Sequence, residues 1–417
     1  MRTAVLALIA LACSPLAAQE TAPPAAFAAP RQLQMQVDVA YLASDLLAGR
    51  AAGSPFADRA AAYIATRMND LGLAPVGTEE GSYLQEFPIV VAGHGHGGGS
   101  APALRTSNVL GLLDNGAART VLIGAHYDHL GFGGSGSGSL HVGDPAPHNG
   151  ADDNASGVAV MLDLAERLGA EGAPREYNFL FAGFSAEELG LVGSKYLAQH
   201  LPAGTDVAAM INFDMVGRLS RDSVLAVNGT GTSPLWDELL PRVAEGRVKI
   251  KPHASGLGPS DHSSFYLEGI PVLHFFTGQH PQYHKPDDDI VLVNFDGMLT
   301  VSDLVYDLVT GLPDDGRIAF AKTKDESQRE VASFKVTMGV MPDYVYAGEG
   351  MRIDGVLADR PAERAGLERG DVLIELDGKA IGDIYDYMEA LGEHEVGDRV
   401  DIVIARDGER LRKRLTF

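Results

Sequence analysis

The sequence has a single cysteine, relatively few basic residues and no long hydrophobic run beyond its N-terminus. Cys13 is the only cysteine among 417 residues, and it lies in the N-terminal apolar segment. If that segment is removed, the mature chain has no means of forming disulfide bonds or zinc sites with thiolate ligands. Lys and Arg number 33 against 56 Asp and Glu, and the formal net charge is −23. We therefore expect no nucleic-acid partner, because phosphate binding requires clustered Lys and Arg.

Two common catalytic motifs are also missing from the sequence. No H-E-x-x-H occurs, which excludes the helix-borne zinc motif of many single-metal proteases. No G-x-S-x-G occurs either, which excludes the strand–turn–helix motif that presents a nucleophilic serine.

The N-terminal segment has the pattern of an export signal, which we assign to residues 1–18. One basic residue precedes an apolar run, and small residues then lead to Ala18, after which we expect cleavage. The run is too short to span a bilayer as a stable helix, and no later apolar run is long enough to do so. We therefore predict an exported protein, periplasmic or secreted, without a transmembrane segment. Acylation at Cys13 as a lipoprotein is the less favoured alternative, because Ala10 stands where leucine is usual.

Composition divides the remaining chain into four parts. Residues 19–32 form a Pro/Ala-rich spacer, and residues 33–315 alternate between apolar runs and helical patterns. Residues 316–329 are more polar and are predicted to be a linker, with the boundary near residue 325. Residues 330–417 form a smaller β-rich domain.

The larger part is predicted to be an α/β domain. Apolar runs typical of strands occur at 121–131, 177–188 and 206–218, with a helical pattern at 157–170 between the first two. Two further helices are predicted to follow Met35. This alternation indicates a mostly parallel mixed sheet flanked by helices. In such sheets ligands bind beyond the carboxyl ends of the strands, which is where polar residues follow these runs.

Five stretches place histidines and carboxylates at these positions. Each has an ordinary alternative role, such as a helix cap or a turn residue, and Ser185 with Glu188 fits a capping box. Together, histidines and carboxylates without cysteine form a ligand set that suits zinc, or alternatively manganese or cobalt. A site with two metals needs a bridging carboxylate, ligands for each metal and a base, and the set supplies all of these. The residues are His126, Asp128, Asp152, Asp153, Glu187, Glu188, Asp214 and His284.

The order of these motifs resembles metallopeptidase family 28 over roughly residues 35 to 312. The motifs are H-x-D, G-A-D-D-N-A-S-G, A-E-E-x-G-L-x-G-S, D-M and Y-H-x-x-x-D. This family contains secreted aminopeptidases with two co-catalytic zinc ions, and glutamate carboxypeptidases and glutaminyl cyclases are related to them. The resemblance implies peptide substrates and two Zn²⁺ ions per chain.

The resemblance also assigns the metal ligands. Asp153 would bridge the two metals, and the peptide bond that follows it is expected to be cis. His126 and Asp214 would complete the first zinc site. Glu188 and His284 would complete the second.

Three further roles follow from the same resemblance. Glu187 would be the general base. Asp128 would not bind a metal itself but would orient the ligand His126. Tyr283 matches a tyrosine that hydrogen-bonds the developing oxyanion in some members. Other members place that tyrosine ahead of an S-D-H stretch, where this sequence has Leu257.

The C-terminal part resembles a PDZ domain over residues 330–417, through the pattern P-A-x-x-A-G-L-x-x-G-D. Pro361 suits the first turn of a short helix, and Gly366 suits its end. An amphipathic helix is predicted at 384–392. A strand is predicted between these helices. Because side chains alternate along a strand, three of its residues are expected to face the core: Val372, Ile374 and Leu376.

A PDZ domain implies a peptide ligand. Residues 338–344 would form the loop whose amides hold a terminal carboxylate, and the peptide would add as a further strand. The alternative is a PDZ fold that serves only as a packing module.

Taken together, these features predict an exported aminopeptidase with two zinc ions and a C-terminal PDZ domain. Two alternatives remain open: another enzyme on the same fold, namely a carboxypeptidase or a glutaminyl cyclase, or a peptide-binding adaptor without catalytic activity.

Overall fold

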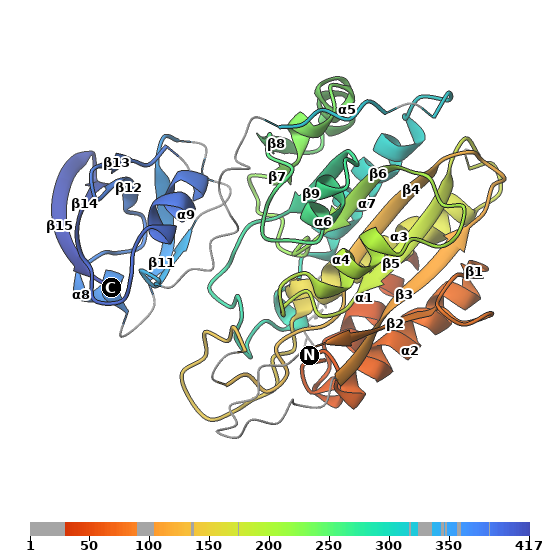
Figure 1. Ribbon diagram of the computed structural model, residues 1–417, viewed down its shortest axis with the longest axis horizontal. Coiled ribbons are helices and arrows are strands. Elements are labelled where there is room, and N and C mark those ends of the chain that lie inside the picture. Colours follow the sequence, from red (N-terminus) through yellow and green to blue (C-terminus); the bar gives the residue numbers. More distant parts are fainter. Residues whose placement is uncertain are drawn as a thin grey trace, which may run out of the picture.

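The larger domain is built on a nine-stranded mixed sheet with the order β1-β3-β5-β4-β6-β9-β7-β8, in which β2 also pairs with β3 (Figure 1). Pairs β5–β4, β4–β6 and β6–β9 are parallel, whereas the pairs that β3 makes are antiparallel. The strands are β1 (Ala74–Pro75), β2 (Leu84–Ile89), β3 (Leu104–Leu113), β4 (Thr120–His126), β5 (Asn178–Phe184), β6 (Val207–Phe213), β7 (Val224–Asn228), β8 (Lys249–His253) and β9 (Val272–Phe276).

The computed structural model does not describe the whole chain. The predicted signal peptide and residues 19–29 of the predicted spacer lie outside the described part. Within that part, no helix has the length and apolar character needed to cross a membrane. The described residues are 30–89, 104–134, 137–173, 175–316, 318–323, 336–342, 346, 348–356, 360–382 and 384–417.

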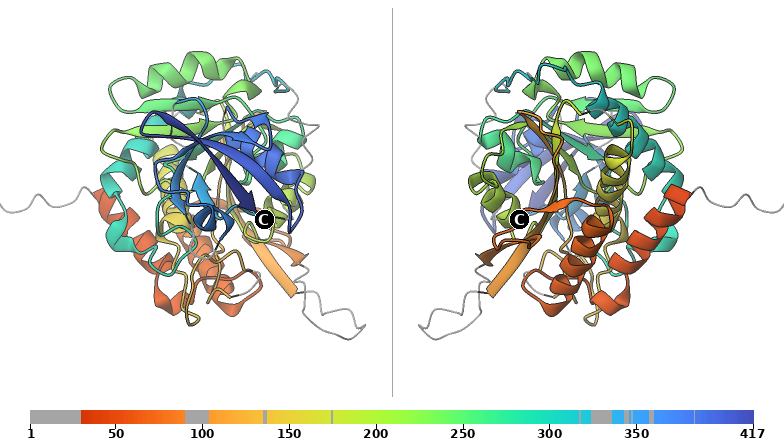
Figure 2. Two further views of the ribbon diagram at one scale, coloured as in Figure 1. Left: turned by 90° about the vertical axis from the view of Figure 1, so that its left-hand side faces the viewer. Right: turned by 90° about the vertical axis from the view of Figure 1, so that its right-hand side faces the viewer.

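Helices cover both faces of this sheet (Figures 1 and 2). Five of them share one hydrophobic core with the sheet, and the residues of α4 and α6 belong to a second core on the other face. The first group is α1 (Pro30–Leu42), α2 (Pro55–Asp70), α3 (Gly157–Gly169), α5 (Leu235–Ala244) and α7 (Phe295–Thr310). The second group is α4 (Val192–Gln199) and α6 (His262–Leu267), and short turns form η1 (Asp45–Leu47), η2 (Ala151–Ser156), η3 (Thr230–Thr232) and η4 (Ile290–Leu292).

The three central strands are the apolar runs of the sequence. Every residue of β4 and β6, and all but the first of β5, is buried. Parallel strands covered by helices on both faces are apolar throughout, not alternating. The predicted α/β sheet is therefore confirmed in this region.

The first helix begins earlier than predicted. Helix α1 starts at Pro30, inside the predicted spacer, whereas the sequence indicated a helical pattern only from Met35. Arg31 accounts for this start, because its guanidinium bonds both carboxylate oxygens of Asp163 on α3, at 2.8 and 2.6 Å. A second bond joins it to Asp303 on α7 at 2.9 Å. These tertiary bonds hold the first turn of α1, which has few apolar residues that would have predicted a helix.

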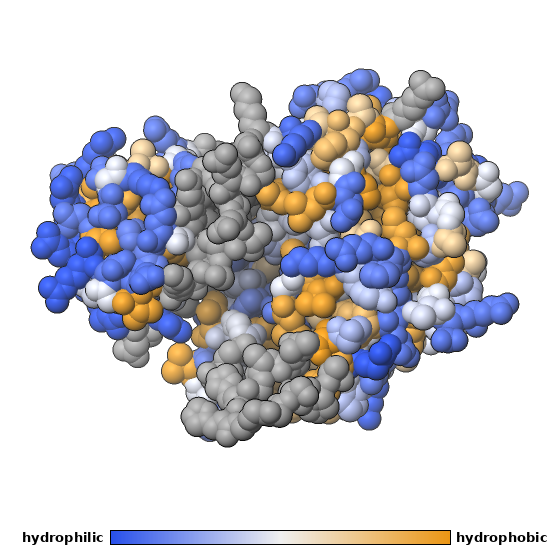
Figure 3. All heavy atoms as spheres, in the orientation of Figure 1, coloured by the Kyte–Doolittle hydropathy of each residue, from blue (hydrophilic) through white to orange (hydrophobic). Residues whose placement is uncertain are grey.

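The C-terminal domain has a separate six-stranded sheet and its own hydrophobic core (Figure 1). Its strand order is β10-β11-β12-β14-β15, with β13 paired to β12, and all pairs are antiparallel. On the face seen in Figure 3, its surface is mostly hydrophilic. The elements are β10 (Val340–Pro342), β11 (Met351–Val356), α8 (Pro361–Arg364), β12 (Val372–Leu376), β13 (Lys379–Ala380), α9 (Ile384–Gly392), β14 (Arg399–Arg406) and β15 (Glu409–Thr416).

The predicted alternation along β12 is wrong for Val372 and Ile374, whereas Leu376 is buried as predicted. Leu373 and Leu376 are fully buried, whereas Val372 and Ile374 are only partly buried. The pairing of β12 with β14 shifts register between Leu373 and Glu375. Such a bulge inserts one extra residue, so the side chains after it change face.

Candidate metal centre

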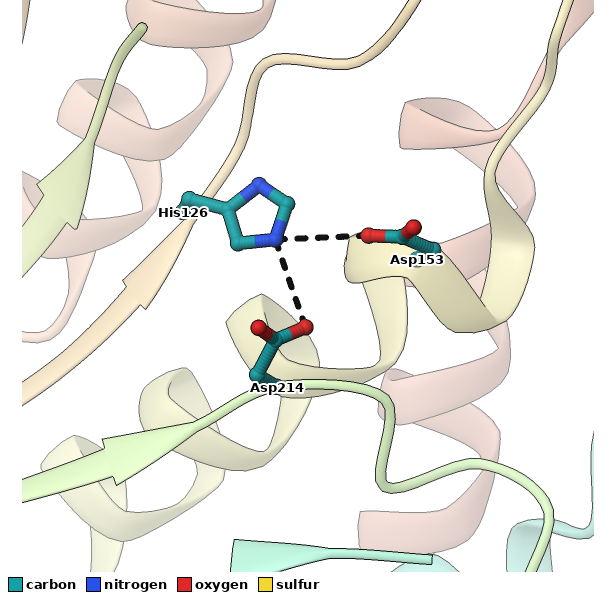
Figure 4. A group of neighbouring side chains, drawn as sticks. All are labelled: His126, Asp153 and Asp214. Atoms are coloured by element: carbon teal, nitrogen blue, oxygen red, sulfur yellow. Dashed lines mark hydrogen bonds and ion pairs between the residues drawn. The ribbon is translucent and has the colours of Figure 1, made fainter. Parts of the chain in front are cut away.

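The predicted ligands lie at one edge of the larger sheet because three neighbouring strands end there. Strand β4 ends at His126, β5 leads into Glu187 and Glu188, and β6 leads into Asp214. Since β5, β4 and β6 are parallel neighbours, their carboxyl ends meet at the same edge. Figure 4 shows the carboxylates of Asp153 and Asp214 pointing toward the ring of His126, with Asp153 coming from the turn η2 before α3.

The first metal group consists of His126, Asp153 and Asp214. The Nε2 atom of His126 lies 3.3 Å from Oδ1 of Asp153 and 3.3 Å from Oδ1 of Asp214 (Figure 4). Zinc bound at about 2.0–2.1 Å from tetrahedral ligands places neighbouring ligand atoms roughly 3.3 Å apart. The three side chains therefore fit a zinc ion.

The second metal group uses the other oxygen of Asp153. The Nε2 atom of His284 lies 3.4 Å from Oδ2 of Asp153 and 3.4 Å from Oε2 of Glu188. Asp153 thus directs one oxygen to each group, which is the arrangement a bridging carboxylate requires. The peptide bond between Asp153 and Asn154 is cis, as predicted.

Carboxylates dominate the electrostatics of the second group. Burial lowers the pKa of His284, but Glu188 and Asp153 outweigh it and raise this pKa to about 9. Bound cations are often the largest charges in a site of this kind, and they would offset the surplus of carboxylates.

The backbone of the site adopts conformations that side chains other than glycine rarely occupy. Ala186, Met215 and His284 have φ values of 59°, 54° and 54°. Each is a predicted ligand or lies next to a predicted ligand or base. Strained backbone of this type clusters at functional sites, where the surrounding structure holds it in place.

Asp288 supports the turn that carries the bridging aspartate. Its Oδ2 atom accepts hydrogen bonds from the amides of Asp152 and Asp153, at 2.9 and 3.0 Å. Arg218 donates to its other oxygen at 2.9 Å. Asp152 itself belongs to neither metal group, and its Oδ1 atom accepts the amide of Gly217 at 2.6 Å. Asp152 is therefore part of the scaffold.

Arg50 ties the same turn to the end of β4. Its side chain is almost fully buried and donates to the carbonyls of Tyr127, Leu42, Asn149 and Gly150 at 2.8, 2.5, 2.5 and 3.1 Å. Burial lowers its pKa to about 10, partly offset by nearby carboxylates. The guanidinium therefore stays charged and links the two chain segments that carry His126 and Asp153.

Asp128 is buried next to the site, but its carboxylate does not make the contact with His126 that the resemblance implied. The Nδ1 atom of His126 lies 3.2 Å from the main-chain oxygen of Asp128 and 3.9 Å from its carboxylate. The carboxylate instead accepts the amides of Glu187 and Glu188 at 3.1 and 3.4 Å. Burial raises the pKa of Asp128 to about 7. Whether this carboxylate orients His126 stays a prediction.

Glu187 has the surroundings of a base. Desolvation, together with Glu188 and Asp214, raises its pKa well above its usual value, although His126 opposes this. The capping-box alternative for this stretch is contradicted. The hydroxyl of Ser185 bonds Thr106 at 2.6 Å, and α4 begins only at Val192.

A cavity of about 420 Å³ opens beside the two metal groups and Glu187. Tyr283 lies at this cavity and stacks on His284 with ring centroids 3.8 Å apart. Its role at an oxyanion stays a prediction. Much of the wall is apolar and is formed by Met215, Leu257, Leu267 and Phe276.

Two residues near the metal groups were missed by the sequence reasoning. The Nδ1 atom of His129 lies 2.7 Å from Oε1 of Glu188. Asp261 is fully buried, and burial raises its pKa to about 7. Both were visible in motif stretches, His129 one residue after Asp128 and Asp261 in the S-D-H stretch, but only tertiary proximity singles them out.

The larger domain, with histidines and carboxylates gathered at the edge of a mixed sheet, has the architecture of the zinc aminopeptidases. Residues 108–309 match the sequence model of Peptidase family M28, and residues 321–416 match that of the PDZ domain. The chain therefore carries a domain of peptidase family M28 followed by a PDZ domain.

Similar proteins are known by sequence and by structure. Aminopeptidase YwaD of Bacillus subtilis is 32% identical over 197 residues, covering 44% of this chain and 39% of that protein. A probable leucine aminopeptidase of Arthroderma benhamiae is 28% identical over 209 residues, covering 46% of this chain and 52% of that protein. The chain thus spans about half or less of the length of these curated relatives.

Solved structures share the fold at low identity. A zinc aminopeptidase from Bacillus subtilis aligns with a TM-score of 0.54 and 20% identity, over 69% of this chain and 97% of that one. A glutaminyl cyclase from Porphyromonas gingivalis aligns with a TM-score of 0.53 and 17% identity, over 67% and 97%. These two likenesses concern the fold alone.

Proposed function

We propose that this protein is an exported aminopeptidase that uses two zinc ions to remove N-terminal residues from peptides. The observation that carries the proposal is the position of Asp153, whose two carboxylate oxygens face two separate groups of candidate ligands. The match to Peptidase family M28 and the curated aminopeptidases among the relatives support it.

When bound, two zinc ions would polarise the scissile carbonyl and acidify the attacking water. Glu187 would take the proton of that water and deliver it to the leaving amine, for which a raised pKa is suited. Tyr283 would donate a hydrogen bond to the developing oxyanion. The cavity would bind the first residue of the peptide, with its apolar wall against the side chain.

A panel of aminoacyl amides, assayed with added zinc, tests this function. We expect release of the first residue from a free N-terminus and no release after the N-terminus is acetylated. Loss of a C-terminal residue would instead indicate a carboxypeptidase. Metal-loaded protein without any hydrolysis would indicate a binding protein.

A second candidate is a glutaminyl cyclase, because one of that activity shares the fold. Incubation of a peptide that begins with glutamine distinguishes the two. A cyclase would release ammonia and leave the peptide with a cyclised first residue, whereas an aminopeptidase would release free glutamine.

For the PDZ domain we propose a peptide ligand with a free C-terminal carboxylate. Strand β10 lies at the edge of its sheet, where a further strand can add. Residues 340–342 of the predicted carboxylate loop form strand β10 instead, and residues 343–344 lie outside the described residues. A fluorescent peptide with a free C-terminus should bind more tightly than the same peptide ending in an amide.

A further inference from the structure

The second metal group is flanked by two histidines, although a single one would complete it. His129 and His284 have ring centroids 5.8 Å apart, and both approach Glu188 and Asp153. Each of them is therefore a candidate ligand on the basis of position alone. The separations of their nitrogen and oxygen atoms distinguish the two.

His284 has the separations of a ligand, and His129 does not. The two separations of 3.4 Å at Nε2 of His284 are close to the roughly 3.3 Å expected between ligands of one tetrahedral zinc. The Nδ1 atom of His129 lies 2.7 Å from Glu188, a length typical of a hydrogen bond to an ionised carboxylate. Its distance to Asp153 is 3.9 Å.

The two histidines also contact different carboxylate oxygens of Glu188. His284 lies beside Oε2, and His129 lies beside Oε1. An ionised carboxylate can only accept hydrogen bonds, so the proton of the shorter contact belongs to Nδ1 of His129. One oxygen of Glu188 is thus held by the protein, and the other is left for a metal.

The ring of His129 is fixed by its surroundings. Its side chain is fully buried, and its amide donates to the carbonyl of Arg50 at 3.3 Å. Gly150 packs so closely that a Cβ atom there would lie 2.6 Å from Cδ2 of the ring, and its φ of 55° also favours glycine. A rigid ring is what a residue that orients a ligand requires.

We propose that His129 is a positioning residue that holds Glu188 through Nδ1–H···Oε1, so that Glu188 presents one oxygen to the second zinc. This inference rests on the proposed function, which supplies the zinc ions. Hydrogen-bond partners of metal ligands typically contribute about tenfold to a hundredfold in metal affinity.

Zinc titration of the metal-free full-length chain against a chromophoric chelator tests the inference. In His129→Phe we expect one of the two dissociation constants to rise about tenfold to a hundredfold, with two ions still bound at saturation. His129→Asn should restore most of the affinity, because its amide nitrogen is attached at the same position as Nδ1. His262→Phe is the matched control, since His262 is equally buried but does not line the cavity.

Each outcome has a defined meaning. Unchanged constants in His129→Phe would overturn the inference. Capacity for only one zinc at saturation, without rescue by His129→Asn, would also overturn it and make His129 a ligand. If the unsubstituted chain bound fewer than two zinc ions, the proposed function itself would fail, whatever the variants showed.

Discussion

Glu187 and Glu188 are neighbours in the chain, yet the fold gives their carboxylates different surroundings. Glu188 faces His284 at 3.4 Å and His129 at 2.7 Å, as a ligand with a supporting partner would. Glu187 lies at the cavity, where burial and neighbouring carboxylates raise its pKa. Two like charges can adjoin here because two cations would lie beside them.

Substitution should therefore separate their roles. Glu187→Gln should retain two zinc ions but lower turnover by about a hundredfold to ten-thousandfold, because the water loses its base. Glu188→Gln should lower the zinc content toward one per chain. Metal analysis and steady-state kinetics on the same preparations measure both effects. Full zinc content and near-normal turnover in both variants would contradict these roles.

At the scale of elements, single side chains join segments that are distant in the sequence. Arg50 connects the end of α1 to the end of β4 and the turn before α3 through four buried carbonyls. Asp288 connects the loop after β9 to the same turn. The metal groups are thus held by bonds between elements more than by any one helix or strand.

We expect Arg50→Met to lower the free energy of unfolding by about 3–5 kcal/mol, because buried carbonyls lose their donor. Urea unfolding followed by fluorescence measures this, since Trp236 is the only tryptophan and is fully buried in the larger domain. Arg59→Met on the exposed side of α2 is the control and should change little. Equal stability of the two variants would show that the four bonds contribute nothing net.

In the PDZ domain, Asp371, which directly precedes β12, pairs with Arg406 at the end of β14 at 2.6 and 2.8 Å. Burial favours a raised pKa for Asp371, but the bonds from Arg406 and from the amide of Glu368 outweigh it and lower this pKa. The ionised pair therefore stabilises the folded domain at pH values above about 3.9, the pKa of aspartate in the unfolded chain. This stabilisation is lost as the pH falls through the lower pKa that Asp371 has in the folded domain.

Asp371→Asn should lower the stability of the PDZ domain by roughly 1–2 kcal/mol near neutral pH. The difference from the unsubstituted protein should shrink below about pH 4, where the aspartate becomes protonated. Amide hydrogen exchange in β12 and β14 measures this, because the single tryptophan lies in the other domain. If the stability difference between the two proteins stayed constant down to pH 2, the Asp371–Arg406 pair would not be its source.

At the scale of the whole molecule, the two sheets have separate hydrophobic cores. All proposed metal ligands lie upstream of residue 316, and the core of the PDZ domain begins at Val336. We therefore propose the boundaries 330–417 for the PDZ domain. The predicted peptidase domain of 33–315 is extended to begin at Pro30, where α1 starts, and to include Ile318, which belongs to its core.

Removal of residues 326–417 should leave a folded peptidase that binds two zinc ions and cleaves small amide substrates as before. Activity on longer peptides is the property expected to change, since only those substrates could reach a second domain. Zinc content, Trp236 fluorescence and rates on both substrate types measure these outcomes. Loss of zinc or of folding would show that the domains depend on each other.

The sequence by itself predicted the two domains and the parallel strands, which follow from local periodicity and composition. The proposed metal ligands and the bridging role of Asp153 are implied by the resemblance of its motifs to family 28. Only the tertiary structure decided the partner of Glu188, the contacts of Asp128 and the buried face of β12. Such features depend on atoms brought together by strand order and by a bulge, and neither is encoded within one short segment.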